Sequence, residues 1–177
     1  LFGCLYGASL FAQALAVGRC YRFEIGDGLA LDNQNGTITF MPSDKNSMSQ
    51  VWRVDLHSAD GHIMLIHPYT GTALDNGNHG ANEETVITWD EERSNPNQAW
   101  RVTEMGGGKV TLTCKPGGLK LGYNDTCQPG GRVWQMNATD NDVFVQWRPV
   151  ETTLKVVNQN EATSSKNDWE REDVYGI

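Results

Sequence analysis

The sequence Gln98-Ala99-Trp100-Arg101 is the strongest indication of the fold, because close variants of it recur twice. The variants are Gln50-Val51-Trp52-Arg53 and Val145-Gln146-Trp147-Arg148, so the tryptophans lie 48 and then 47 residues apart. A second phrase precedes each tryptophan: Gly28-Leu29-Ala30-Leu31-Asp32, Gly71-Thr72-Ala73-Leu74-Asp75 and Gly118-Leu119-Lys120-Leu121-Gly122. Two phrases that keep step three times indicate three copies of one structural unit.

Short strand-like runs separated by turn clusters fill each copy, and no long helical period of apolar residues occurs. Many short strands at regular spacing predict an all-β barrel or sandwich. Three copies of about four strands each predict a β-trefoil with pseudo-threefold symmetry. We place this domain at residues 17–151, with repeats at about 19–58, 59–106 and 107–151. The expected strands include Cys20–Ile25, Leu29–Leu31, Thr37–Met41, Val51–Asp55, Ile63–Ile66, Thr85–Trp89, Trp100–Thr103, Lys109–Cys114, Arg132–Met136 and Phe144–Arg148.

The two ends of the chain differ from the repeats in composition. Residues 1–16 are apolar and uncharged and end in Ala14-Leu15-Ala16, the small-x-small pattern of a signal-peptidase site. We interpret them as a signal-peptide remnant, with an ordinary apolar arm as the alternative. Residues 152–177 are rich in carboxylates and predict an acidic C-terminal extension, which Trp169 and Tyr175 could pin to the barrel.

Cysteines and glycosylation sequons favour export. If residues 1–16 are removed, Cys4 leaves with them. Cys114 and Cys127 then flank one strand-turn-strand segment, which predicts a local disulfide and leaves Cys20 unpaired or in another connectivity. Three sequons begin at Asn35, Asn124 and Asn137. The expected localisation is therefore secreted, and the expected product a glycoprotein.

The net charge of −8 and the pI near 4.9 restrict the partners of the 177-residue chain. Nucleic acids and anionic membranes require a dense positive surface, so we expect neither as a partner. The apolar N-terminal stretch is also too short for a membrane span, and we expect no membrane insertion.

The repeated phrase resembles the ricin-type β-trefoil lectin family, whose repeats carry a Gln-x-Trp motif. The resemblance covers about residues 19–151, with two motifs intact and the third altered to Val145-Gln146-Trp147. We expect Trp52, Trp100 and Trp147 to fill the core of the barrel, because a large aromatic at the same place in each copy contributes several kcal/mol through burial. The Gln is expected to be a buried amide that bonds backbone at a turn.

The resemblance implies a sugar site built from four groups in one copy. A carboxylate accepts hydrogen bonds from neighbouring sugar hydroxyls, an aromatic ring stacks on the apolar sugar face, an Asn bonds a hydroxyl and the Gln orients the carboxylate. The second repeat has all four, namely Asp75, Trp89, Asn97 and Gln98. Asn78 and His79, in the loop after Asp75, are further candidate contacts. The alternative is that Asp75-Asn76-Gly77-Asn78 is an ordinary turn.

The other two repeats lack parts of this set. The first keeps Asp32 and Gln50 but has Met41 at the aromatic position and Ser49 at the Asn position. The third has Gly122, Met136 and Phe144-Val145 at the carboxylate, aromatic and amide positions. Trp134 lies on the same strand face as Met136 but has no carboxylate nearby. We therefore expect one competent site, in the second repeat.

No catalytic, metal or cofactor motif accompanies the repeats. His57, His62 and His67 favour exposed hairpin histidines over a metal site. Asp90, Glu91 and Glu92 are adjacent in sequence, whereas glycosidase carboxylates lie opposed across a cleft, about 5–10 Å apart. Gly106-Gly107-Gly108-Lys109 lacks the spacing of a phosphate loop. We expect a protein that is no enzyme and has no cofactor.

These observations predict a secreted lectin that binds glycans or glycoproteins and is a monomer. The resemblance implies galactose or N-acetylgalactosamine as the sugar. Two alternatives remain, because one fold hosts many functions. The first is a β-trefoil protease inhibitor, and the second is a structural or interaction protein with a vestigial sugar site.

Overall fold

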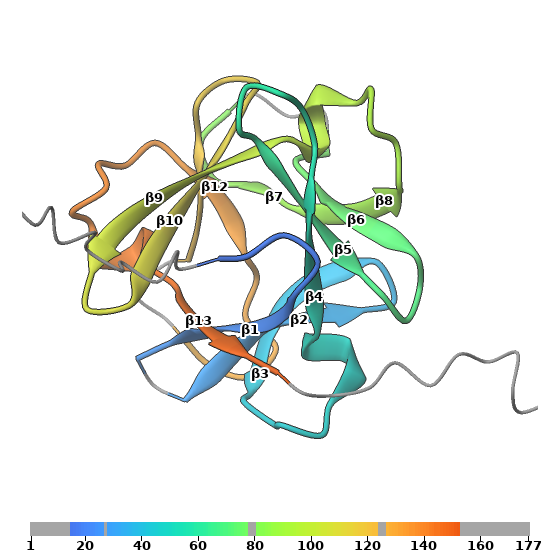
Figure 1. Cartoon of the computed structure of the whole chain (residues 1–177). Coiled ribbons are helices and arrows are strands. Elements are labelled where there is room, and N and C mark those ends of the chain that lie inside the picture. The colour runs from blue at the N-terminus through green and yellow to red at the C-terminus, as the bar shows by residue number, and fades with distance from the viewer. Residues whose placement is uncertain (1–14, 27, 78–80, 124–126, 153–177) are drawn as a thin grey trace, which may run out of the picture.

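The computed structural model describes residues 15–26, 28–77, 81–123 and 127–152. These residues form antiparallel strands joined by turns and three short 3-10 helices (Figure 1). The first repeat contains β1 (Cys20–Ile25), β2 (Leu29–Gln34), β3 (Thr37–Pro42), η1 (Met48–Gln50) and β4 (Trp52–Leu56). The second contains β5 (Ile63–His67), β6 (Thr72–Asp75), β7 (Glu84–Thr85), β8 (Ile87–Asp90), η2 (Pro96–Gln98) and β9 (Trp100–Gly106). The third contains β10 (Lys109–Cys114), β11 (Lys120–Gly122), β12 (Trp134–Met136), η3 (Val143–Val145) and β13 (Arg148–Glu151).

The first and last strands of the repeats form a closed barrel. Strand β1 pairs with β4, β4 with β5, β5 with β9 and β9 with β10. The ring closes where β10 meets the third repeat at the Val110–Trp147 bridge and where β13 pairs with β1. Closure removes the exposed strand edges that an open sheet would present.

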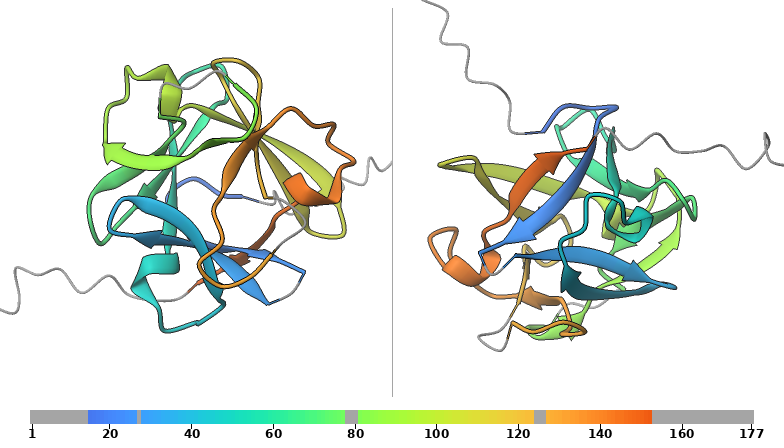
Figure 2. Two further views of the ribbon diagram at one scale, coloured as in Figure 1. Left: turned by 180° about the vertical axis from the view of Figure 1, so that it is seen from behind. Right: turned by 90° about the horizontal axis from the view of Figure 1, so that it is seen from below.

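The middle strands of each repeat form three hairpins that cap this barrel (Figure 2). They are β2–β3, β6–β8 and β11–β12, each antiparallel. The hairpins meet one another through the pairs Thr37–Ile87, Thr85–Trp134 and Thr39–Arg132. The all-β fold with three repeats of about four strands, predicted from the sequence, is confirmed.

The three repeated tryptophans occupy equivalent places in the core. Trp52, Trp100 and Trp147 are fully buried, as predicted. Each indole Nε1–H donates to the carbonyl that precedes the repeated Asp or Gly position: Leu31 at 3.2 Å, Leu74 at 3.0 Å and Leu121 at 2.9 Å. Each repeat thus ties its last segment to its second strand while it satisfies the polar atom of a buried ring.

The strand predicted at Phe144–Arg148 is wrong. Residues Val143–Val145 form η3, and β13 starts only at Arg148. The side chain of Asp142 caps this helix by accepting a hydrogen bond of 3.0 Å from Phe144 N. Val145 is fully buried and Phe144 packs on the core. The apolar residues of this stretch are therefore core residues of a short helix and do not belong to a strand.

The predicted Cys114–Cys127 disulfide is also wrong, since no bond joins these two thiols, and Cys20 is a free cysteine. Cys114 ends β10 and is buried, with its Sγ donating to the carbonyl of Asn97 at 3.6 Å. Burial raises the pKa of the Cys114 thiol to about 12, and the negative charge of Asp75 acts in the same direction. This thiol therefore faces the second repeat, and nearness to Cys127 in sequence does not bring about a bond.

Two of the three histidines are buried, which corrects the expectation of exposed hairpin side chains. His62 Nδ1 lies 2.8 Å from Asp60 Oδ1. His67 lies between the carbonyl of Met48, at 3.1 Å from Nε2, and Thr70 Oγ1, at 2.9 Å from Nδ1. Within the described residues, no three His, Cys, Asp or Glu side chains are grouped to hold a metal ion.

The ends of the described chain lie on the barrel. Leu15 is buried in the main core, and Ala16 N donates to the Tyr21 hydroxyl at 2.9 Å. Cleavage after Ala16, as the sequence predicts, would remove Leu15 from this core. At the other end, Thr152 N donates to Cys20 O at 2.9 Å.

Most of the predicted signal remnant and the acidic extension lie outside the described residues, as does the sequon at Asn124. The sequons at Asn35 and Asn137 are exposed. No helix in the described part of the chain is long and apolar enough to cross a membrane.

Candidate functional site

Asp75 is the last residue of β6 and is held by three hydrogen-bond donors. Its side chain is buried, with the residue only 3% exposed. Oδ1 accepts from Gly77 N at 2.7 Å, and Oδ2 accepts from Gln98 Nε2 and Asn95 Nδ2, both at 3.1 Å. The carboxylate is therefore fixed in one orientation, and charge-assisted bonds of this kind are stronger than neutral ones.

Gln98 links Asp75 to the segment that follows β8. Its Nε2 also donates to Asp90 O at 2.8 Å, and its Oε1 accepts from Glu92 N at 2.9 Å. The residue is fully buried, so the repeated Gln is the buried amide that the sequence predicts. Gln98 lies behind the carboxylate and orients it, as the resemblance implies.

Trp89 lies on β8 and is 59% exposed. It pairs with Ala73 on β6, two residues before Asp75, while its neighbour Thr88 is buried. Trp52, Trp100 and Trp147 are fully buried, so Trp89 differs from the repeated tryptophans in having most of its surface in water. A large apolar surface left in water next to fixed polar groups is characteristic of a recognition site.

A depression of about 230 Å³ brings these side chains together. Asp75, Trp89 and Asn97 line it, and Gly77, Ile87 and Asn95 complete the lining. The Asn97 backbone is fixed, because its N donates to Asn95 Oδ1 at 3.0 Å and its carbonyl accepts from Asn76 N at 3.1 Å. The remaining two predicted contacts, Asn78 and His79, lie outside the described residues.

Asn95 is a site residue that the sequence reasoning missed. It is the N-cap of η2, and its side chain accepts from Asn97 N and donates to Asp75. An Asn directly before Pro96 at the start of a short helix is a typical capping residue, and this signal could have placed it. Its second bond, across the repeat to Asp75, is visible only in the tertiary structure.

The first repeat has the same frame with different side chains. Met41 pairs with Ala30 as Trp89 pairs with Ala73, which confirms Met41 at the aromatic position. Asp32 is buried, and its Oδ2 accepts from Gln50 Nε2 at 3.0 Å and from Ser49 Oγ at 2.9 Å. Gln34 Nε2 donates to its Oδ1 at 2.6 Å. The corresponding donor to Asp75 is the backbone of Gly77, which has no side chain to cover the carboxylate.

The third repeat has no room for a carboxylate. A Cβ atom added at Gly122 would lie 2.5 Å from Met136 Cγ and 3.0 Å from both Phe144 O and Val145 Cγ1. Met136 pairs with Lys120 and so takes the place of Trp89, whereas Trp134 pairs with Gly122 and takes the place of Ile87. The region that forms the depression in the second repeat is filled here by side chains of the repeat itself.

A closed barrel capped by three hairpins defines this protein as a β-trefoil. The model of the family described as "Ricin-type beta-trefoil lectin domain-like" matches residues 48–136, and the chain belongs to this family. No curated protein matches the chain by sequence.

Solved structures agree with the fold. The designed threefold-symmetric protein ThreeFoil is 27% identical, with a TM-score of 0.66 over 74% of this chain and 97% of that one. The ricin B-like lectin of Macrolepiota procera, solved in complex with lactose, is 12% identical, with a TM-score of 0.63 over 76% of this chain and 96% of that one. An exo-β-1,3-galactanase of Clostridium thermocellum is 19% identical, with a TM-score of 0.68 over 78% of this chain but 31% of that one.

Proposed function

We propose that this protein is a lectin that binds galactose- or N-acetylgalactosamine-type glycans at one site, in the second repeat. The observation that carries the proposal is the exposed ring of Trp89 in the same depression as the fixed carboxylate of Asp75. A pyranose has one face rich in C–H groups and edges rich in hydroxyls, so it needs an apolar plate beside a strong acceptor.

Each lining group has a role in this proposal. The Trp89 ring stacks against the C–H face of the sugar. Asp75 accepts hydrogen bonds from two neighbouring hydroxyls, and the Asn97 amide bonds a third polar group. Gln98 and Asn95 hold the carboxylate and thus reduce the freedom that binding must remove. The preference for galactose-type sugars rests on the family resemblance and on the lactose complex of the Macrolepiota procera lectin.

The same proposal includes binding without catalysis, export of the chain and a monomeric state. Export is supported by the apolar residues 1–16 and by the two exposed sequons, Asn35 and Asn137.

A single small site binds a monosaccharide weakly, because few atoms are buried and hydroxyls lose water. Because only the second repeat has the full residue set, calorimetry with galactose should give a stoichiometry near one per chain. A value near three would contradict the loss of sites in the first and third repeats.

A glycan array probed with the purified protein tests the proposal. Wild type should bind galactose- or N-acetylgalactosamine-terminated glycans, and Trp89→Ala should lose this binding. Met41→Ala is the matched control, because Met41 holds the equivalent position in the first repeat. Binding to no glycan would overturn the proposal and favour an interaction protein. Equal binding by Trp89→Ala and wild type would overturn the assignment of the site to the second repeat.

A further inference from the structure

We infer that the end of the first repeat positions the binding loop of the second, with Arg93 and His57 as positioning residues for the proposed sugar site. The binding loop is residues 91–97, which run from the end of β8 to η2 and carry Asn95 and Asn97. The inference rests on the proposed function, since it gives these residues a part in sugar affinity.

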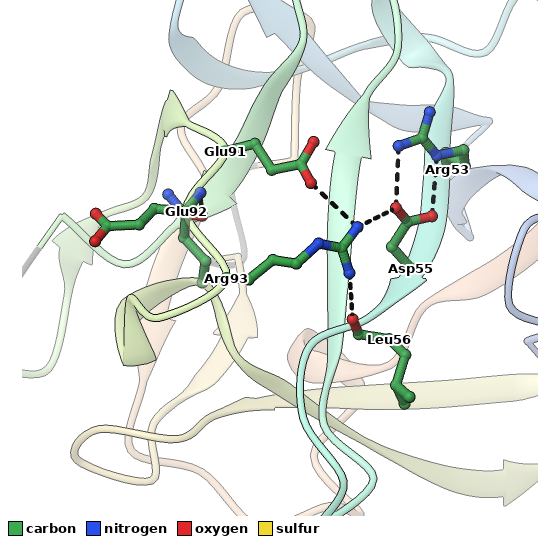
Figure 3. Close-up of polar contacts among 7 residues, drawn as sticks. Arg53, Asp55, Leu56, Glu91, Glu92 and Arg93 are labelled. Carbon is green, nitrogen blue, oxygen red and sulfur yellow. Dashed lines mark hydrogen bonds and ion pairs between the residues drawn. The ribbon is translucent and has the colours of Figure 1, made fainter.

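Arg93 ties the binding loop to the end of β4 (Figure 3). Its Nη2 donates to Asp55 Oδ2 at 3.0 Å, and its Nη1 donates to Leu56 O at 2.8 Å. The same guanidinium reaches Glu91 Oε1 at 3.2 Å, inside the loop. One side chain of the second repeat thus bonds a carboxylate and a carbonyl of the first.

The carboxylate of Asp55 is held in place by a second arginine. Arg53, two residues earlier on β4, holds both oxygens of Asp55, with Nε at 2.9 Å from Oδ1 and Nη2 at 3.0 Å from Oδ2. The Asp55 side chain is only 16% exposed, whereas the Arg93 side chain is 55% exposed. An isolated exposed ion pair stabilises little, but this pair belongs to a network that also includes a bond to backbone.

His57 makes a second tether at the other end of the loop. Its Nε2 lies 3.0 Å from Asn95 O, and since a carbonyl can only accept, Nε2 carries the proton. Asn95 in turn donates to Asp75 and accepts from Asn97 N. His57 therefore holds the backbone of Asn95, whose side chain bonds the carboxylate that lines the depression.

The equivalent loop of the first repeat is held differently. There, Ser43 Oγ donates at 2.6 Å to Glu24 on β1 of the same repeat, and His67 of the second repeat lies 3.1 Å from Met48 O. The loop that carries the intact residue set is the one that the preceding repeat tethers at two points. The contacts of Arg93 and His57 therefore indicate that the first repeat, although its own set is incomplete, supports the site in the second.

The test compares Arg93→Ala, His57→Phe and their double variant with wild type. Arg19→Ala is the matched control, because it removes an arginine from an exposed ion pair with Glu151 that does not involve the loop. Affinity for galactose and N-acetylgalactosamine is measured by calorimetry, and backbone amide exchange of residues 91–97 is measured without sugar. Thermal unfolding confirms that each variant folds.

We expect each single variant to speed exchange in the binding loop and to weaken sugar binding about three- to tenfold, because looser positioning of polar groups lowers affinity. Arg19→Ala should change neither quantity. Unchanged exchange, or faster exchange with unchanged affinity, would overturn the inference. If wild type binds neither sugar, the proposed function fails, and the exchange measurement still decides whether Arg93 and His57 hold the loop.

Discussion

The side-chain amide of Gln98 donates a hydrogen bond of 3.1 Å to Oδ2 of Asp75. Gln50 donates to Oδ2 of Asp32 in the same way, at 3.0 Å, and both carboxylates are buried. The frame that orients the acid is therefore shared by two repeats. The difference between them lies in the flanking positions, where Trp89 and Gly77 stand in the second repeat against Met41 and Gln34 in the first.

Asp75→Asn should reduce affinity for galactose far more than Asp32→Asn. The loss of a charged acceptor typically costs about 1.5–3 kcal/mol, which corresponds to roughly a ten- to hundredfold weaker complex. In both variants an amide replaces the carboxylate that accepts a hydrogen bond from the neighbouring Gln side chain. We therefore expect both variants to be destabilised by similar amounts in thermal unfolding. Calorimetry measures the affinity. Equal loss of binding in the two variants would contradict the assignment of the site to the second repeat.

Gly122→Ala should destabilise the protein by about 1–3 kcal/mol, as overpacking of a filled core does. The reason is the 2.5 Å approach of a new Cβ to Met136 Cγ. Adding Met136→Ala should restore part of the space, so the double variant is expected to be less destabilised than the sum of its parts. Gly26→Ala is the control, since nothing lies within 4 Å of a Cβ there. Denaturant unfolding measures the differences, and a neutral Gly122→Ala would show that the third repeat retains room.

The stability of the protein should fall as the pH drops below about 6.5, partly because of His67. Burial lowers the pKa of His67, against smaller opposing contributions from the Met48 carbonyl and the charge of Asp32. The folded state therefore binds fewer protons than the unfolded state between the two pKa values. Stability from this group is complete above the unfolded pKa and is lost as the pH falls toward the folded one. Unfolding curves at pH 7.5 and 5 should show a smaller decrease for His67→Gln than for wild type, and equal decreases would refute this.

Cys114 should resist alkylation in the folded protein. It is 1% exposed, and a thiol pKa of about 12 leaves almost no reactive thiolate at pH 8. Iodoacetamide should label it only after unfolding in guanidinium, whereas the partly exposed Cys127 should react in the native state. Peptide mapping by mass spectrometry distinguishes the two. A Cys114–Cys127 linked peptide from a non-reduced digest would contradict the structure, in which no disulfide joins these residues.

The fold could be predicted from the sequence, because its two repeated phrases mark residues that every copy of the unit needs. A buried tryptophan and its hydrogen-bonded partner recur at Trp52, Trp100 and Trp147, since each fills the same place in the barrel. Asp75, Trp89, Asn97 and Gln98 could be named from the family resemblance, since the repeat register gives their positions.

Contacts between side chains far apart in the sequence could not be predicted. Asn95 on Asp75, Arg93 on Asp55 and the Cys114 thiol on Asn97 O join residues that are 20, 38 and 17 positions apart. No local pattern encodes such pairs. They arise when the chain folds back within a repeat, as for Asn95 and Asp75, or when closure of the barrel brings different repeats together. The same reason explains the wrong disulfide. Nearness of Cys114 and Cys127 in the chain suggested a bond, but the packing of β10 directs the Cys114 side chain into the core beside the second repeat.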